Sequence, residues 1–126
     1  MPAPRSVLRL IHWSAFLYLI VLTLLLELPS LPEEIAPLCE TWAFSKHLAA
    51  FAILGFLVEL GRSKGTMFFW VGVLIFYGIG TEVLQLLLHS LCNRFFAWED
   101  ILHNTLGVLL GTFIGHFCRP FVTSLQ

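Results

Sequence analysis

Charged side chains are scarce in this sequence, and their scarcity excludes most classes of soluble protein. Seven Lys and Arg and eight Asp and Glu occur in 126 residues, whereas 58% of the residues are hydrophobic. A soluble domain is about one-quarter charged and about half apolar. This chain cannot cover a water-facing surface with polar groups, and its twelve Phe and four Trp exclude a disordered chain. We therefore expect an integral membrane protein.

The sequence also lacks several features that would indicate a particular function. A formal net charge of -1 gives no electrostatic basis for a nucleic-acid partner. No repeat, low-complexity tract or second domain is visible, so residues 1–126 are expected to form one domain. No phosphate-binding glycine loop or nucleophile elbow occurs. The histidines and carboxylates suit Zn²⁺ or Mn²⁺, but no local spacing such as His-Glu-x-x-His is present, and we expect neither a metal nor a cofactor.

The sequence does contain four long apolar segments. They are residues 7–28, 42–60, 67–91 and 98–118. About 20 helical residues, rising 1.5 Å each, cross a hydrocarbon core of about 30 Å, so each segment is predicted to span the membrane. The alternation of apolar and polar residues typical of a membrane β-barrel is missing. The expected fold is an all-α, polytopic bundle of four transmembrane helices.

The distribution of Lys and Arg predicts the orientation of this bundle. With a cytoplasmic N-terminus, the residues that fall inside are Arg5, Arg9, Arg62, Lys64 and Arg119. The two that fall outside are Lys46 and Arg94. Because cytoplasmic loops carry an excess of positive charge, both termini are predicted to be cytoplasmic.

Polar residues inside the predicted helices gather toward the external side. Glu82, Gln85 and His89 share one face of the third helix, and Asp100 and Asn104 share one face of the fourth. Glu82 would lie roughly 10 Å below the outer interface, where a carboxylate is costly unless it faces the bundle or finds a partner. The donors expected nearby are Lys46, His47 and Arg94. These positions predict a polar pocket that opens outward.

Each of these residues also has a purely structural interpretation. Lys46 and Arg94 could extend to lipid headgroups, and Asp100 could cap the fourth helix. Gln85 and Asn104 could join helices by hydrogen bonds. Glu82 is the strongest functional candidate, because a carboxylate at that depth is by default a functional residue.

A stripe of small residues continues the Asp100–Asn104 face. It consists of Gly107, Gly111 and Gly115, which would let a neighbouring helix approach closely. The same stripe would also serve a homo-oligomer.

Several of these residues form blocks that resemble a known family. The blocks are Ser45-Lys46-His47-x-x-x-Phe51, Tyr77-Gly78-x-x-x-Glu82-x-x-Gln85, Arg94 and Asp100-x-x-x-Asn104-x-x-Gly107-x-x-x-Gly111. In order and spacing they resemble the VanZ-like membrane proteins, over about residues 45 to 111. The family pattern has an acidic residue before the Lys-His pair, where Ser45 stands here.

The resemblance implies a location and a broad context. It implies a multi-pass protein of the bacterial cytoplasmic membrane and a link to teicoplanin resistance, with which the family's namesake is associated. It supplies no mechanism. The family's polar positions fall on Lys46, His47, Glu82, Gln85, Arg94, Asp100 and Asn104.

Four functions are compatible with the predicted pocket. In the first, it binds an anionic amphiphile of the cell envelope: a lipid, a lipid-linked precursor or an acylated glycopeptide antibiotic. Lys46, His47 and Arg94 would then hold the headgroup. Glu82 and Asp100 would fix these cations, and Gln85 and Asn104 would orient the ligand.

In the second, the protein is an enzyme that modifies such a molecule, with Glu82 and His47 as general base and acid. The third is a small transporter or proton-linked channel subunit, against which the cytoplasmic half offers almost no polar groups. In the fourth, the polar cluster is a non-catalytic lock within the bundle.

The predicted topology also brings two cysteines to the external side. Cys39 and Cys92 would lie in the two external loops, and an oxidising compartment would allow a disulfide between them. Non-reducing mass spectrometry of membranes should then detect one cross-linked peptide pair. Two thiols that are alkylated without prior reduction would exclude the bond.

Overall fold

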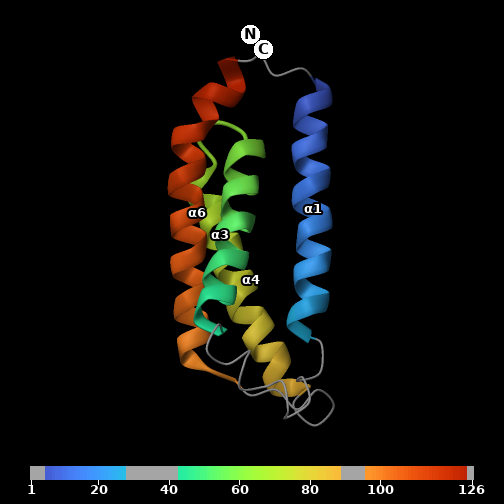
Figure 1. Ribbon diagram of the computed structural model, residues 1–126, viewed down its shortest axis with the longest axis vertical. Coiled ribbons are helices and arrows are strands. Elements are labelled where there is room, and N and C mark those ends of the chain that lie inside the picture. The colour runs from blue at the N-terminus through green and yellow to red at the C-terminus, as the bar shows by residue number, and fades with distance from the viewer. Residues whose placement is uncertain (1–4, 28–42, 89–95, 125–126) are drawn as a thin grey trace.

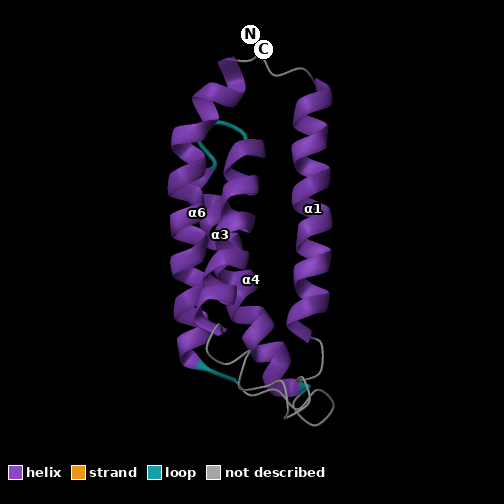
Figure 2. Cartoon of the chain, viewed as in Figure 1, coloured by secondary structure: helices purple, strands orange, loops and turns teal. Residues whose placement is uncertain are grey.

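The described part of the chain folds into four helices. The computed structural model describes residues 5–27, 43–88 and 96–124. Its helices are α1 (Arg5–Glu27), α3 (Ala43–Gly61), α4 (Met67–Leu87) and α6 (Trp98–Ser124). The described residues contain no strand, as Figure 2 shows. The predicted all-α architecture is confirmed.

Three of these helices are long and apolar enough to cross a membrane. The spanning segments are Ser6–Leu24, Met67–Leu87 and Trp98–Val122. Helix α3 has 19 residues and runs alongside them in the same bundle (Figure 1). The chain is therefore a membrane protein.

Two helices end more than two residues away from the predicted position. Helix α4 ends at Leu87, four residues before the predicted end, and residues 89–95 lie outside the described part. Helix α6 was predicted to end at 118 but continues through Pro120 to Ser124. The prediction followed the apolar segment, which stops before Arg119, whereas the helix continues through a proline, a residue that removes one backbone donor and usually ends or kinks a helix.

The helices alternate in direction along the chain (Figure 1). We call the end with Arg5, Gly61, Met67 and Ser124 the proximal end. The end with Glu27, Ala43, Leu87 and Trp98 is the distal end. Helices α3 and α6 therefore run parallel, both from the distal to the proximal end. At both ends of the contact between α3 and α6, hydrogen bonds join residues that are 57 positions apart in the sequence.

Glycines bring the backbones of α3 and α6 into contact. A Cβ added at Gly111 would lie 1.9 Å from the Ala52 carbonyl oxygen, and one at Gly107 would lie 2.5 Å from that of Leu48. Small residues allow such an approach in membranes, where dispersion contacts rather than water exclusion hold helices together. The stripe that the sequence offered for a homo-oligomer, which also includes Gly115, is thus buried inside one chain.

A small apolar core lies at the centre of this bundle. Its buried members are Leu22, Phe51, Leu54, Leu74 and Val108. Two polar contacts attach α1: the Tyr18 hydroxyl donates to the Ala50 carbonyl at 2.7 Å, and the hydroxyls of Thr23 and Tyr77 lie 2.6 Å apart. Much of the remaining α1 surface is apolar and exposed, as suits a helix that faces lipid.

The glycine contact predicts a position-dependent effect of adding one methyl group. Gly111→Ala should destabilise the protein by about 1–3 kcal/mol, because the new Cβ would overlap α3 backbone. Gly72→Ala is the matched control, since a Cβ there meets nothing within 4 Å. Alanine also favours a helix by about 1 kcal/mol over glycine, so the control should keep or raise the melting temperature. Equal melting temperatures for the two variants would contradict this packing.

Candidate functional site

Polar residues from three helices meet near the distal end. The distal cluster, as we call it, consists of His47 on α3, Glu82 and Gln85 on α4, and Asp100 and Asn104 on α6. At 1.5 Å per residue, Asp100, His47 and Glu82 lie within about 8 Å of the ends of their helices. A site at this depth lies in reach of both lipid headgroups and lipid chains.

The cluster is buried and closely spaced. Glu82 is 0% exposed and Asn104 is 2% exposed. The Nδ1 atom of His47 lies 3.0 Å from Asn104 Oδ1, and its Nε2 atom lies 3.9 Å from Asp100 Oδ2. One ligand atom each from His47, Glu82 and Asp100 lie within 4.8 Å of one another. The packing of α4 against α6 therefore brings the two predicted carboxylates, Glu82 and Asp100, to one place.

An apolar layer lies one helical turn below the cluster. Four residues beyond His47 on α3 is Phe51, and four beyond Asn104 on α6 is Val108; both are fully buried. Four residues before Glu82 on α4 is Gly78, where a Cβ would lie 3.2 Å from both Asn104 Cβ and the Phe51 ring. Gly78 thus lets α4 come close enough to α6 for Glu82 to join the cluster.

Lys46 and Arg94, the two predicted cations other than His47, are not among the residues of the distal cluster. Lys46 is exposed, because successive residues of a helix point about 100° apart and His47 faces the bundle. The predicted residues Arg94 and His89 lie outside the described part of the chain, as do Cys39 and Cys92. Asp100 sits within the first turn of α6, which begins at Trp98, and not at the helix cap.

His103 adds a further group beside Asp100. Its Nδ1 atom lies 3.9 Å from Asp100 Oδ1, one turn along the same helix. Asp100 therefore stands between two imidazoles, His47 on α3 and His103 on α6.

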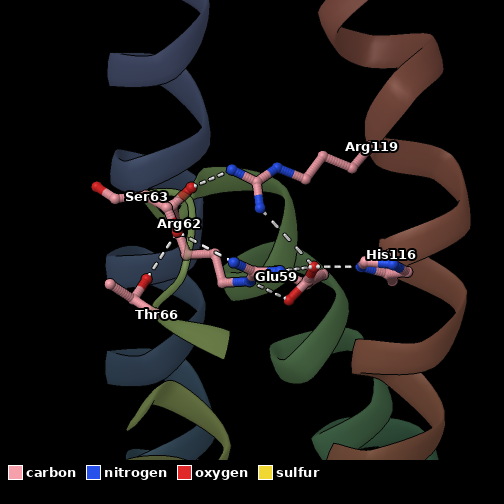
Figure 3. Close-up of polar contacts among 6 residues, drawn as sticks. All are labelled: Glu59, Arg62, Ser63, Thr66, His116 and Arg119. Carbon is pink, nitrogen blue, oxygen red and sulfur yellow. Dashed lines mark hydrogen bonds and ion pairs between the residues drawn. The ribbon is translucent and has the colours of Figure 1, made fainter. Parts of the chain in front are cut away.

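A second polar group, the proximal cluster, lies at the opposite end of the α3–α6 contact (Figure 3). Its members are Glu59, Arg62, His116 and Arg119. Arg62 and Glu59 form a bidentate pair. Arg62 donates from Nε to Glu59 Oε2 and from Nη2 to Glu59 Oε1, the latter at 2.6 Å. His116 Nδ1 lies 3.3 Å from Glu59 Oε1. The Glu59 side chain is thus held from both α3 and α6.

The proximal cluster also closes the end of α3. Arg119 donates from Nη2 to the Arg62 carbonyl oxygen at 2.7 Å, and Arg62 donates from Nη1 to the Ser63 carbonyl at 3.0 Å. The last carbonyls of a helix have no partner within it, so Arg119 satisfies the carbonyl that directly follows α3. The Ser63 carbonyl lies in the turn beyond the helix and also accepts from the Thr66 hydroxyl at 2.8 Å. The arrangement is that of a structural lock between α3, the following turn and α6.

This cluster was not predicted from the sequence, and the expectation of almost no polar groups in the half of the bundle predicted to be cytoplasmic was wrong. Glu59 is 2% exposed and lies near the end of an apolar segment, where it was read as part of the span. The available signal was its i, i+3 spacing to Arg62, which places both side chains on one helix face. The partners from α6 are too distant in sequence to be inferred.

A cavity of about 360 Å³ lies between α1, α3 and α4. Its wall is mostly apolar and includes Phe16, Leu54, Trp70 and Tyr77. It shares no residue with the distal cluster, so it is not the polar pocket that the sequence predicts.

Comparison with known proteins gives one match. The family model described as VanZ/LLP1 matches residues 13–119, which include both polar clusters. No curated protein and no solved structure matches the chain. The family resemblance read from the sequence is confirmed.

We expect the stability of the protein to depend strongly on the ion pair between Glu59 and Arg62. Glu59→Gln should cost about 3–5 kcal/mol, because it leaves the buried Arg62 guanidinium without its counter-charge. His116→Gln should cost far less, since 60% of the His116 side chain is exposed. The measurement is thermal unfolding in detergent.

A double variant separates the ion pair from local packing. Replacing both Glu59 and Arg62 by Met should recover much of the stability lost in Glu59→Gln, since no buried charge is left alone. A double variant less stable than Glu59→Gln would show that the charges themselves are required.

Proposed function

The chain belongs to the VanZ/LLP1 family, and from that membership we propose that its distal cluster binds the headgroup of an anionic amphiphile of the cell envelope. The candidate ligands are a lipid, a lipid-linked precursor and an acylated glycopeptide antibiotic of the teicoplanin type. In this proposal the chain lies in a bacterial cytoplasmic membrane with its basic proximal end inside. The distal end then faces the envelope.

One observation carries the proposal: Glu82 is fully buried beside His47 and Asp100 in a chain with only fifteen charged residues. Burying a carboxylate within a membrane costs at least a few kcal/mol, and such groups usually mark a functional site. Stability alone does not require this arrangement, because the proximal cluster already fixes α3 against α6. A ligand that contacts these groups accounts for their presence.

The available groups divide into two kinds. The two carboxylates, of which Glu82 is fully buried, accept hydrogen bonds and suit the hydroxyls or amides of a sugar or peptide headgroup. Asn104 adds an amide donor, because its Nδ2 atom finds no hydrogen-bond partner among the described residues. Lys46, which is exposed next to His47 in the chain, would pair with phosphate at the rim. Arg94 lies outside the described residues and stays a predicted phosphate ligand. An amphiphile would use all of these while its chains remain in the membrane.

Catalysis is the second candidate function, and the His47 geometry favours it. An imidazole 3.9 Å from one carboxylate and close to another can pass a proton to or from a bound headgroup. Glu82 as general base and His47 as general acid would then support hydrolysis or group transfer.

Transport by a single copy is less well supported. The two polar clusters on α3 are separated by twelve residues, or about 18 Å of helix. Phe51, Leu54 and Val108 are buried between them and are almost fully inaccessible. A polar path through the described part of one bundle is therefore interrupted.

Glu82→Gln tests the proposal directly. The probes are phosphatidylglycerol, a polyprenyl-phosphate sugar and teicoplanin, each titrated into the purified protein with thermal stabilisation as the readout. At least one probe should stabilise the wild type, and the variant should bind it at least tenfold more weakly, because a lost charged hydrogen bond is worth about 1.5–3 kcal/mol. Glu99→Gln is the matched control, since Glu99 is an exposed carboxylate on α6.

The same variant separates binding from catalysis. A binder retains the probe unchanged, whereas an enzyme converts it, and Glu82→Gln should abolish that conversion while the protein stays folded. Equal binding by wild type and Glu82→Gln for every probe would contradict the proposal.

A further inference from the structure

We propose that His47, Glu82 and Asp100 bind a divalent transition-metal ion, Zn²⁺ or Mn²⁺, at the distal cluster. The three residues come from α3, α4 and α6, so the ion would join the three helices that meet there. Sequence motifs did not indicate a metal, because the ligands are dispersed over three helices and have no local spacing.

The distances suit a metal centre. Nitrogen and oxygen ligands lie about 2.0–2.2 Å from such ions, so two ligand atoms on opposite sides of one are at most about 4.4 Å apart. His47 Nε2 and Asp100 Oδ2 are 3.9 Å apart, within this limit. Ligand atoms around a tetrahedral ion are about 3.4 Å apart. The whole set lies within 4.8 Å, so side-chain rotations that move the carboxylate oxygens inward by about 1 Å would complete the fit.

Asn104 prepares His47 to act as a ligand. Its Oδ1 atom can only accept, so His47 Nδ1, 3.0 Å away, must carry the proton and donate it. In the neutral imidazole this leaves the lone pair on Nε2, the atom that faces Asp100. Histidines that bind metals commonly donate their other ring N–H to such an acceptor, which fixes the tautomer and the ring orientation.

The ligand set favours a transition metal over Mg²⁺ or Ca²⁺. Those ions prefer oxygen ligands alone, whereas an imidazole with two carboxylates suits Zn²⁺ or Mn²⁺. Three protein ligands also leave at least one coordination position open, as in catalytic metal sites.

The cluster also contains a buried hydrogen-bond donor. Asn104 is 2% exposed, and its Nδ2 atom finds no hydrogen-bond partner within residues 5–27, 43–88 and 96–124. An oxygen bound to the metal would accept this bond. Where that oxygen belongs to a headgroup, the inference rests on the proposed function. The bound ion would then supply the positive charge that lets an anionic headgroup approach Glu82 and Asp100. Metal binding itself does not depend on a lipid ligand.

Metal titration of the full chain in detergent tests the inference. After treatment with EDTA, Zn²⁺ is titrated against a chromophoric chelator, and Mn²⁺ binding is followed by electron paramagnetic resonance. The wild type should bind one ion per chain. His47→Gln and Asp100→Asn should each lower the affinity at least a hundredfold, and Asn104→Ala about 10–100-fold.

Two histidine variants serve as controls. His116→Gln removes a half-exposed imidazole of the proximal cluster and should leave the affinity unchanged. His103→Gln removes the imidazole on the other side of Asp100, which is not itself a proposed ligand, and should lower the affinity less than His47→Gln does. Thermal unfolding without metal confirms that each variant is folded. A variant that does not fold is replaced by Asp100→Glu, which should weaken metal binding because it alters the distance between the carboxylate and the ion.

Two results would overturn the inference: a wild type that binds less than one ion per chain, or an affinity that is unchanged in His47→Gln. No lipid probe enters this titration, so its outcome is independent of the test of the proposed function. A wild type that binds the metal ion but none of the three amphiphile probes would refute the proposed function alone.

Discussion

The close approach of α3 and α6 is the constraint on which the remaining structure depends. Gly107 and Gly111 let the α6 backbone rest on the carbonyls of Leu48 and Ala52, with no room for a side chain between them. Since the two helices run parallel, one constant offset sets every contact along them. That offset places Asn104 opposite His47 at the distal end and, at the proximal end, His116 opposite Glu59.

The two polar clusters use the same register for different purposes. At the proximal end every charged group has a clear structural partner: Arg62 and His116 hold Glu59, and Arg119 caps α3. At the distal end two carboxylates lie close together with one imidazole between helices, and a buried amide donor finds no partner in the described residues. A lock satisfies its polar groups internally, whereas a binding site keeps some for a ligand. This difference is why we assign function to the distal cluster.

Much of the fold and part of the site could be predicted from the sequence. Scarce charge and four apolar segments determine a membrane bundle, and helical spacing alone places Glu82 with Gln85 and Asp100 with Asn104 on their faces. The features that the sequence could not determine depend on tertiary contacts. Lys46 and His47 are adjacent, so only one can face the bundle, and composition does not say which. Glu59 was missed because its partners on α6 become neighbours only after α3 and α6 pack.

The central claim is that the distal cluster receives a ligand from the membrane. A structure of the purified protein in its native lipids tests it most directly. The account predicts headgroup density between α3, α4 and α6, within hydrogen-bond distance of Asn104 Nδ2 and close to Glu82. Lipid density confined to the outer faces of the helices, with the cluster closed by its own side chains, would contradict it.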